Sequence, residues 1–266
     1  MNLQRCPKEF NKFERRWWKF YLDVVTERGL MTAGRDTPSR LVFDTLAGPI
    51  PVRLDVGPAA DAAPGAAALR VSRVSYESPR ARVLAGGLRL AVAGRTVPAD
   101  LVSCAGLFAI VDSESAGVAL GADTLPELRR AAVPIGDAVE ARARKAAKDA
   151  PGPGGVHVVF IGPSSAGSSD LRSATVAPGG HVSLSPSGRA TAAIAAVLDA
   201  MGLLPGDRPL IDEGLLGLAL EGRVLGRSAD DPPAIAVEVS GTAWPTGDHE
   251  FVFDPGDPLG RARESG

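Results

Sequence analysis

The stretch HVSLSPSGRATAAIAAVLDAMGLL, His181–Leu204, combines the signals from which the fold is predicted. It begins as a strand-like run, turns at Ser-Pro-Ser-Gly, and continues with small residues at helical spacing. Pro186 constrains the approach, and Ser187 lies where a helix N-cap is expected. We therefore predict a helix over residues 188–201 that begins directly after a serine.

The start of this helix is a candidate anion site. The first backbone N–H groups of a helix have no acceptor within it, and the helix dipole adds positive potential there. Gly188 leaves these N–H groups unobstructed, so a small carboxylate would suit the position. Alternatively, Ser187 only caps the helix, for a gain of about 1 kcal/mol. The spacing alone leaves both interpretations open.

Length, charge and cysteine content restrict the class of protein. With 266 residues, 45% of them hydrophobic, the chain can build one large or two modest cores. Its 29 Lys and Arg nearly balance 31 Asp and Glu, so no net field attracts nucleic acid or anionic lipid. Cys6 and Cys104 cannot form a disulfide framework, and no Cys/His cluster has the spacing of a metal site. Without a long apolar run or signal peptide, we expect a soluble cytoplasmic protein that has no metal and contacts no membrane.

The first 20 residues differ in composition from the rest of the chain. They contain every Asn and Gln, three of the five lysines and two of the three tryptophans. One hypothesis is that residues 1–20 are an atypical segment that replaced an ancestral beginning, which N-terminal sequencing would test. The alternative is an amphipathic helix that lies on a membrane or a partner, although Glu9, Glu14 and Asp23 interrupt its basic face.

Downstream, strand and helix patterns alternate, as in an α+β or α/β architecture of two lobes. We expect a hairpin over Ser39–Val56, a loose connection after it, a helix over Thr124–Ala150 capped by Thr124, and strands over residues 69–78, 83–94, 100–113, 156–163, 171–184, 222–227, 234–244 and 249–255. The strand over residues 100–113 is interrupted by Gly106.

Neither glycine-rich segment predicts a cofactor site. PGPGGVH follows a helix and precedes a strand, which is the reverse of the order in a dinucleotide site. GPSSAGSSD, Gly162–Asp170, lacks the lysine of a phosphate loop and is interpreted as a flexible turn. Neither contains the Gly-x-Ser-x-Gly elbow of an α/β-hydrolase.

Four ordered blocks resemble those of a known family. DTLAGPIPVRLDV matches a Thr-Pro-Ala-Gly hairpin, and DLVSCAGLFAIVDSESAGVAL with LPELRR matches an Asp-Ile-Ala-Tyr-Gly-Gly-Asn strand and the helix after it. LSPSGRATAA matches Arg-Ser-Pro-Cys-Gly-Thr-Gly-Thr-Ser-Ala, and SGTAWPTGDHEFVFDPGDPLG matches the C-terminal end. From about Leu22 to Gly260 the chain therefore resembles the proline racemase family, which includes proline racemases, hydroxyproline 2-epimerases and trans-3-hydroxy-L-proline dehydratases.

The resemblance implies a diaminopimelate epimerase-like α+β (α/β) fold. Two pseudo-symmetric lobes each wrap a β-barrel-like sheet around a central helix, and the helix N-termini bind the carboxylate of proline or hydroxyproline between them. One cysteine from each lobe removes or returns the α-proton, and dehydratases carry threonine in place of the second-lobe cysteine. The family uses no metal or organic cofactor, and its members are usually homodimers.

Transferred to this chain, the second-lobe cysteine position is Ser187, the predicted catalytic residue. Gly188, Arg189 and Ala190 are the predicted substrate-binding residues, although arginine and alanine replace the family's threonine and glycine. A serine hydroxyl is hardly ionised near neutral pH, so Ser187 is a weak base. Cys104 is either a displaced thiol or, as for most strand cysteines, part of the core.

The first lobe is incomplete in this comparison. Its Met-Cys-Gly-His-Gly motif would fall on residues 13–17, where nothing matches, and roughly a hundred preceding residues of the family have no counterpart. We therefore expect residues 21–86, with 247–266, to be a remnant of the first lobe and residues 87–246 to form the second.

Three hypotheses for function follow. The chain is an epimerase- or dehydratase-like enzyme that abstracts the α-proton of proline or hydroxyproline, or a non-catalytic descendant that binds a small amino acid or a related protein. A non-functional remnant that folds poorly is the third hypothesis.

Overall fold

The computed structural model describes residues 39–45, 48–58, 69–146, 154–165, 167–204 and 208–242. The predictions for residues 1–20, for the strand over 249–255 and for the last turn of the helix over 124–150 lie outside these ranges. Most of the loose connection after the hairpin lies outside them as well.

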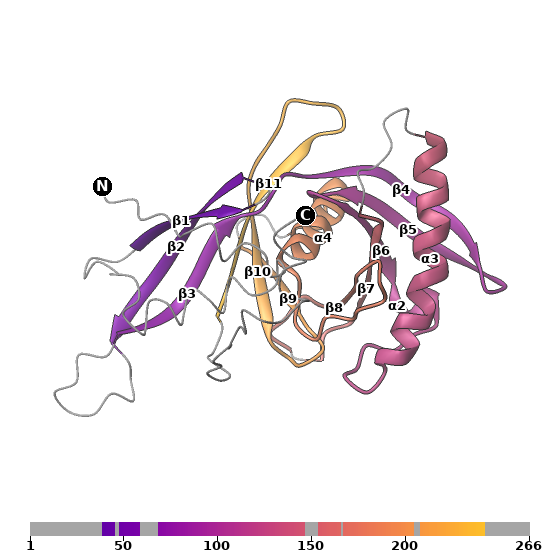
Figure 1. Ribbon diagram of the computed structural model, residues 1–266, viewed down its shortest axis with the longest axis horizontal. Helices are drawn as coiled ribbons and strands as arrows, with labels where there is room; N and C mark the ends of the chain where they lie inside the picture. The colour runs from indigo at the N-terminus through magenta and orange to yellow at the C-terminus, as the bar shows by residue number, and fades with distance from the viewer. Residues whose placement is uncertain are drawn as a thin grey trace, which may run out of the picture.

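Eight strands close into a ring around one helix (Figure 1). In ring order they are β4 Ala81–Val92, β5 Arg95–Ser103, β6 Leu107–Asp112, β7 Val156–Gly162, β8 Leu171–Val176, β9 Leu210–Glu213, β10 Ala219–Arg227 and β11 Ala234–Gly241. The ring closes where β11 pairs with β4 through Ala234 with Arg82 and Ile235 with Ala81. Only the β6–β7 and β8–β9 pairs of the ring are parallel. This arrangement confirms the prediction of a barrel-like sheet around a central helix.

The enclosed helix is α4, Gly188–Ala200, which confirms the helix predicted over residues 188–201 to within one residue. Every residue from Ala190 to Val197 is buried. A helix that is apolar on all sides must be covered on all sides, and the alanines allow the strands to approach closely. The helix packs against β4, β5, β6, β10 and β11.

The same sheet extends beyond the ring through β11. Strands β1 Ser39–Thr45 and β2 Gly48–Pro58 form the predicted antiparallel hairpin, and β3 Leu69–Glu77 joins β2 to β11. The Arg73 guanidinium on β3 also donates to Glu221 Oε1 on β10, at 2.8 Å. The apolar side chains of β1–β3 belong to the same core as those of α4.

A long outer helix covers the opposite side of the ring (Figure 1). Helix α3, Leu125–Ala146, packs on β4, β7 and β8 and builds a second core with Leu128, Ile135 and Val139. Thr124 precedes it as predicted, and its carbonyl accepts from the Leu128 N–H at 3.0 Å. The short helix α2, Ser113–Ala116, is capped by Asp112, which accepts from the Ser115 N–H. None of the helices among the described residues is both long and apolar enough to cross a membrane.

The strand expected over residues 100–113, with an interruption at Gly106, is in fact two strands, because β5 and β6 form a tight hairpin there. The backbone reverses at Cys104–Gly106, where φ is +44° at Ala105 and +149° at Gly106. Glycine tolerates such a conformation, whereas alanine is strained in it. The strand β9, of four residues, was not predicted, although it completes the ring.

We predict that Ile194→Ala lowers the free energy of unfolding by about 2–5 kcal/mol, because it leaves a cavity at the centre of the ring. Ile194 is 0% exposed on α4. Urea denaturation followed by circular dichroism would measure the change.

Leu225→Ala is the control, since Leu225 is 51% exposed on β10 and its loss should change stability by less than about 0.5 kcal/mol. Equal effects of the two substitutions would contradict the central role of α4.

Candidate functional site

Ser187 occupies the N-cap position of α4, as predicted, but its side chain does not cap the helix. Its backbone is extended, with φ −97° and ψ 125°, and its carbonyl accepts from the Thr191 N–H at 2.8 Å. The hydroxyl makes no capping hydrogen bond. The half-buried Ser187 hydroxyl therefore leaves the first N–H groups of the helix to other partners.

Tyr76 of β3 lies directly against Gly188. A Cβ added to Gly188 would lie 3.1 Å from Tyr76 Cζ and even closer to the hydroxyl oxygen, so only glycine fits there. Burial raises the pKa of Tyr76 above its usual value, and the neighbouring Cys104 adds to the effect. The phenol is therefore neutral over the physiological pH range. Sequence reasoning missed Tyr76, since nothing in its strand pattern links it to the helix.

Arg189 points back to the β5–β6 turn. Its Nη1 donates to the Ala105 carbonyl at 2.7 Å, and the guanidinium lies 5.4 Å from the centre of the Phe108 ring. The Phe108 ring in turn stacks on His157 at 4.9 Å. A cation over an aromatic face is held by the ring quadrupole. The positive charge of Arg189 therefore stays beside the first turn of α4, tied to the neighbouring hairpin.

Ala190 presents only its backbone to the start of the helix, because its side chain is 0% exposed and belongs to the central core. The predicted site residues Ser187, Gly188, Arg189 and Ala190 are thus consecutive at one helix end. The fold adds Tyr76 and the Cys104–Gly106 turn to them, although these are distant in sequence.

Cys104 is a core residue. It is 0% exposed, its Sγ lies 3.2 Å from the Pro79 carbonyl oxygen, and burial raises the pKa of its thiol to about 12. A thiol with this pKa is almost entirely protonated near neutral pH. The core interpretation of Cys104 fits this geometry, and proton abstraction by its thiolate does not.

Two buried carboxylates at the end of β9 fasten the neighbouring elements. Asp212 Oδ2 accepts from Thr191 Oγ1 on α4 at 2.6 Å. Glu213 accepts from the hydroxyls of Ser164 and Ser165 and forms an ion pair with Arg172 at 2.6 Å. The loop that was interpreted as a flexible turn is therefore bound to a buried charge through Ser164 and Ser165. The acidic pair in the alternating segment LIDEG was the signal in the sequence that could have pointed to these two carboxylates.

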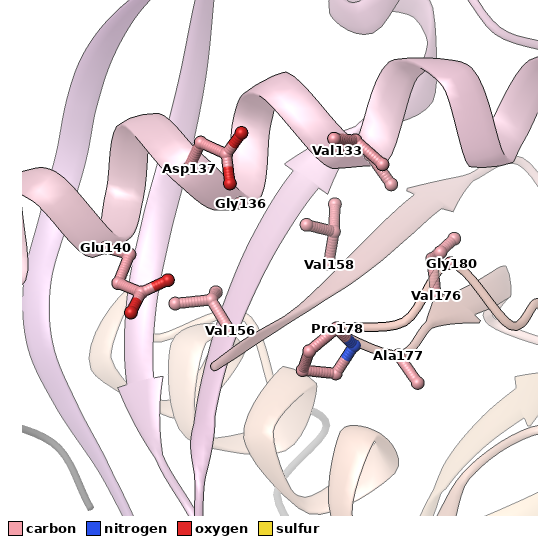
Figure 2. Close-up of a pocket in the computed structure, with 11 residues that line it drawn as sticks. Val133, Gly136, Asp137, Glu140, Val156, Val158, Val176, Ala177, Pro178 and Gly180 are labelled. Atoms are coloured by element: carbon pink, nitrogen blue, oxygen red, sulfur yellow. The ribbon is translucent and has the colours of Figure 1, made fainter. Parts of the chain in front are cut away.

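A separate hollow of about 150 Å³ lies on the outer side of the ring, between α3 and strands β7 and β8 (Figure 2). Val156, Val158 and Val176 line it, with Asp137 and Glu140 on the helix. No residue of α4 contributes to this hollow. In the described part of the chain, no three His, Cys, Asp or Glu side chains are grouped as metal ligands would be.

A match to a protein-family model shows which family the chain belongs to. A family model described as proline racemase matches residues 22–262. The chain belongs to the proline racemase family. This confirms the resemblance over about Leu22 to Gly260.

Curated members of the proline racemase family align with part of the chain. The 4-hydroxyproline 2-epimerase of Streptosporangium roseum is 30% identical over 60% of this chain and 48% of its own length. The trans-3-hydroxy-L-proline dehydratase of Bacillus cereus is 27% identical over 72% of this chain and 58% of its own length. The chain thus spans about half the length of these curated relatives.

A solved structure confirms the predicted fold class. A hydroxyproline epimerase from Agrobacterium vitis, with bound trans-4-hydroxy-L-proline, superimposes with a TM-score of 0.72 at 19% identity. The match covers 90% of this chain and 66% of the epimerase. The ring around α4 is therefore an architecture of the proline racemase family, with the diaminopimelate epimerase-like fold.

We predict that Cys104 reacts with iodoacetamide at pH 8 more than about 100-fold more slowly in the native protein than in urea, because burial suppresses its thiolate. Peptide mass spectrometry would measure labelling of Cys104 separately from that of Cys6. Rapid native labelling would contradict the burial and the raised pKa.

Proposed function

We propose that the chain binds proline or a hydroxyproline by its carboxylate at the N-terminus of α4 and takes part in a dehydratase- or epimerase-like abstraction of the α-proton. The observation that carries this proposal is a helix end whose N-cap hydroxyl does not cap the helix. The N–H groups of Gly188, Arg189 and Ala190 precede the first intrahelical bond, which Thr191 donates to Ser187.

Electrostatics supports a carboxylate at this position. The first N–H groups of a helix and the helix dipole attract an anion, and the Arg189 guanidinium lies beside the same turn. Binding the carboxylate there withdraws charge from Cα, which stabilises the carbanion-like transition state of α-proton removal. Neither a metal nor an organic cofactor enters the proposed reaction.

The residue types favour dehydratase-like chemistry over epimerisation. Epimerisation needs a competent acid or base on each face of Cα, whereas the Ser187 hydroxyl is hardly ionised. Elimination from trans-3-hydroxy-L-proline needs one base for the α-proton. The C3 hydroxyl takes up a proton and leaves as water, and the resulting enamine tautomerises to a cyclic imine. We assign Ser187 to substrate contact or weak proton transfer and assign no described residue as a stronger base.

Non-catalytic binding of the same amino acids is the second candidate. The buried Cys104 thiol favours it, since the pKa of about 12 removes the nearest thiolate from the chemistry. Either candidate is compatible with a cytoplasmic homodimer that has no nucleic-acid or membrane partner, and we propose this state as well. The division into a first-lobe remnant, 21–86 with 247–266, and a second lobe, 87–246, belongs to it as well.

We predict that the purified chain, incubated in D2O, exchanges or eliminates the α-proton of trans-3-hydroxy-L-proline faster than those of L-proline and trans-4-hydroxy-L-proline. Proton NMR would follow each α-proton and identify an imine or an epimer. Ser187→Ala should slow the reaction about 5- to 10-fold, the effect of one lost hydrogen bond of about 1 kcal/mol.

Ser187→Cys is the matched gain-of-function variant. A thiol at this position should speed α-proton loss on the order of 10²-fold, with the rate rising with pH as the thiol ionises. Binding without any α-proton loss would support the non-catalytic candidate. Neither binding nor proton loss, from a protein that melts cooperatively, would refute the proposed function.

A further inference from the structure

We infer that Asp212 is a positioning residue for the ligand site, because through Thr191 it holds the first turn of α4 in place. This inference rests on the proposed function for the identity of the ligand. The mechanical part of the claim concerns the helix start alone and is tested independently below.

The Asp212–Thr191 contact joins a ring strand to the enclosed helix. Thr191 Oγ1 donates to Asp212 Oδ2 at 2.6 Å, and both residues are 0% exposed. A hydrogen bond from a hydroxyl to a buried carboxylate is short and roughly twice as strong as a neutral one. The helix is thus attached to β9 within its first turn.

Thr191 is attached to two further groups. Its N–H donates to the Ser187 carbonyl at 2.8 Å, and its hydroxyl lies 3.1 Å from the same oxygen. Its methyl group packs on β10, where a Cβ added to Gly222 would lie only 3.1 Å from Thr191 Cγ2. A change at Thr191 would therefore be transmitted directly to the Ser187 backbone.

The two residues after Asp212 hold the chain on the other side of Ser187. A Cβ added to Gly214 would lie 2.8 Å from the Pro186 nitrogen and 3.0 Å from Ser185 Cα, so β9 ends in close contact with the approach to the helix. Glu213 anchors the same end of β9 through its ion pair with Arg172. The turn after Ser187 is thus bonded to Asp212 near the end of β9, and the segment before Ser187 lies against Gly214 just beyond that end.

This arrangement replaces the usual role of an N-cap side chain. A capping serine fixes the first turn with its own hydroxyl, but Ser187 makes no such bond and the first turn of α4 contains no acidic residue. A fully buried carboxylate costs desolvation energy that an apolar residue would avoid. Asp212 supplies the missing anchor from outside the helix and leaves the Ser187 hydroxyl available to a ligand.

Amide hydrogen exchange measured by NMR tests the mechanical claim. Thr191→Val removes the hydroxyl but keeps the branched shape. It should speed exchange at least about 10-fold at the amides of residues 191–193, which bond to the first turn, and leave those of 195–197 unchanged. Thr191→Ser, which keeps the hydroxyl, should restore wild-type exchange. If Thr191→Val does not fold, Asp212→Asn should show a smaller acceleration at the same amides.

Thr175→Val is the matched control. Thr175 is also buried, at 4% exposure, and its hydroxyl has no hydrogen-bond partner within the described residues, so its loss should leave residues 191–193 unaffected. A uniform acceleration along α4 in Thr191→Val, or none, would overturn the inference, because either result means that the bond does not hold the first turn specifically.

Titration with trans-3-hydroxy-L-proline, followed by NMR chemical shifts, tests whether the Asp212–Thr191 hydrogen bond supports ligand binding. Thr191→Val should raise the dissociation constant at least about 10-fold, and Thr191→Ser should not. Unchanged affinity in Thr191→Val, despite faster local exchange, would overturn the positioning role. If the wild-type protein binds no proline derivative, the proposed function fails, and the exchange data alone decide whether Asp212 holds the helix start.

Discussion

The burial of one small, alanine-rich helix is the constraint on which the rest of the structure depends. Helix α4 has no polar face for water from Ala190 to Val197, so the chain must surround it. Eight strands do this only because alanine side chains keep the helix narrow, and the ring then closes through β4 and β11. Charged groups are displaced to the two ends of the helix, and the N–H groups that precede the first intrahelical bond lie at its N-terminus.

The candidate site follows from the way in which this helix end is enclosed. Tyr76 covers Gly188, while Arg189 is drawn to the β5–β6 hairpin by Ala105. Proton chemistry is the weakest part of this arrangement, because Ser187 is a poor base and the Cys104 thiol is buried. In this member of the proline racemase family, the helix end that we propose as a carboxylate site is thus better formed than the proposed acid/base chemistry.

The sequence predicted the features that depend on local pattern. The hairpin over Ser39–Val56 has alternating apolar residues and a turn signal, and α4 has a proline approach followed by small residues. The β5–β6 turn was missed because it requires a left-handed alanine that no turn motif announces. The anchoring of α4 by β9 could not be predicted either, because a short strand with two acids is typical of a surface loop unless its partners are known. Thr191, which donates to Asp212, and Arg172, which pairs with Glu213, are both distant in sequence.

Strand β11 is shared between two structures. Its first residues close the ring against β4, while Glu238–Gly241 pair with β3, and Val239 stands opposite Tyr76. The strand therefore belongs both to the β1–β3 extension of the sheet and to the ring. Because β3 carries Tyr76 and pairs directly with β11, the strand that closes the ring also sets where the Tyr76 ring lies over Gly188.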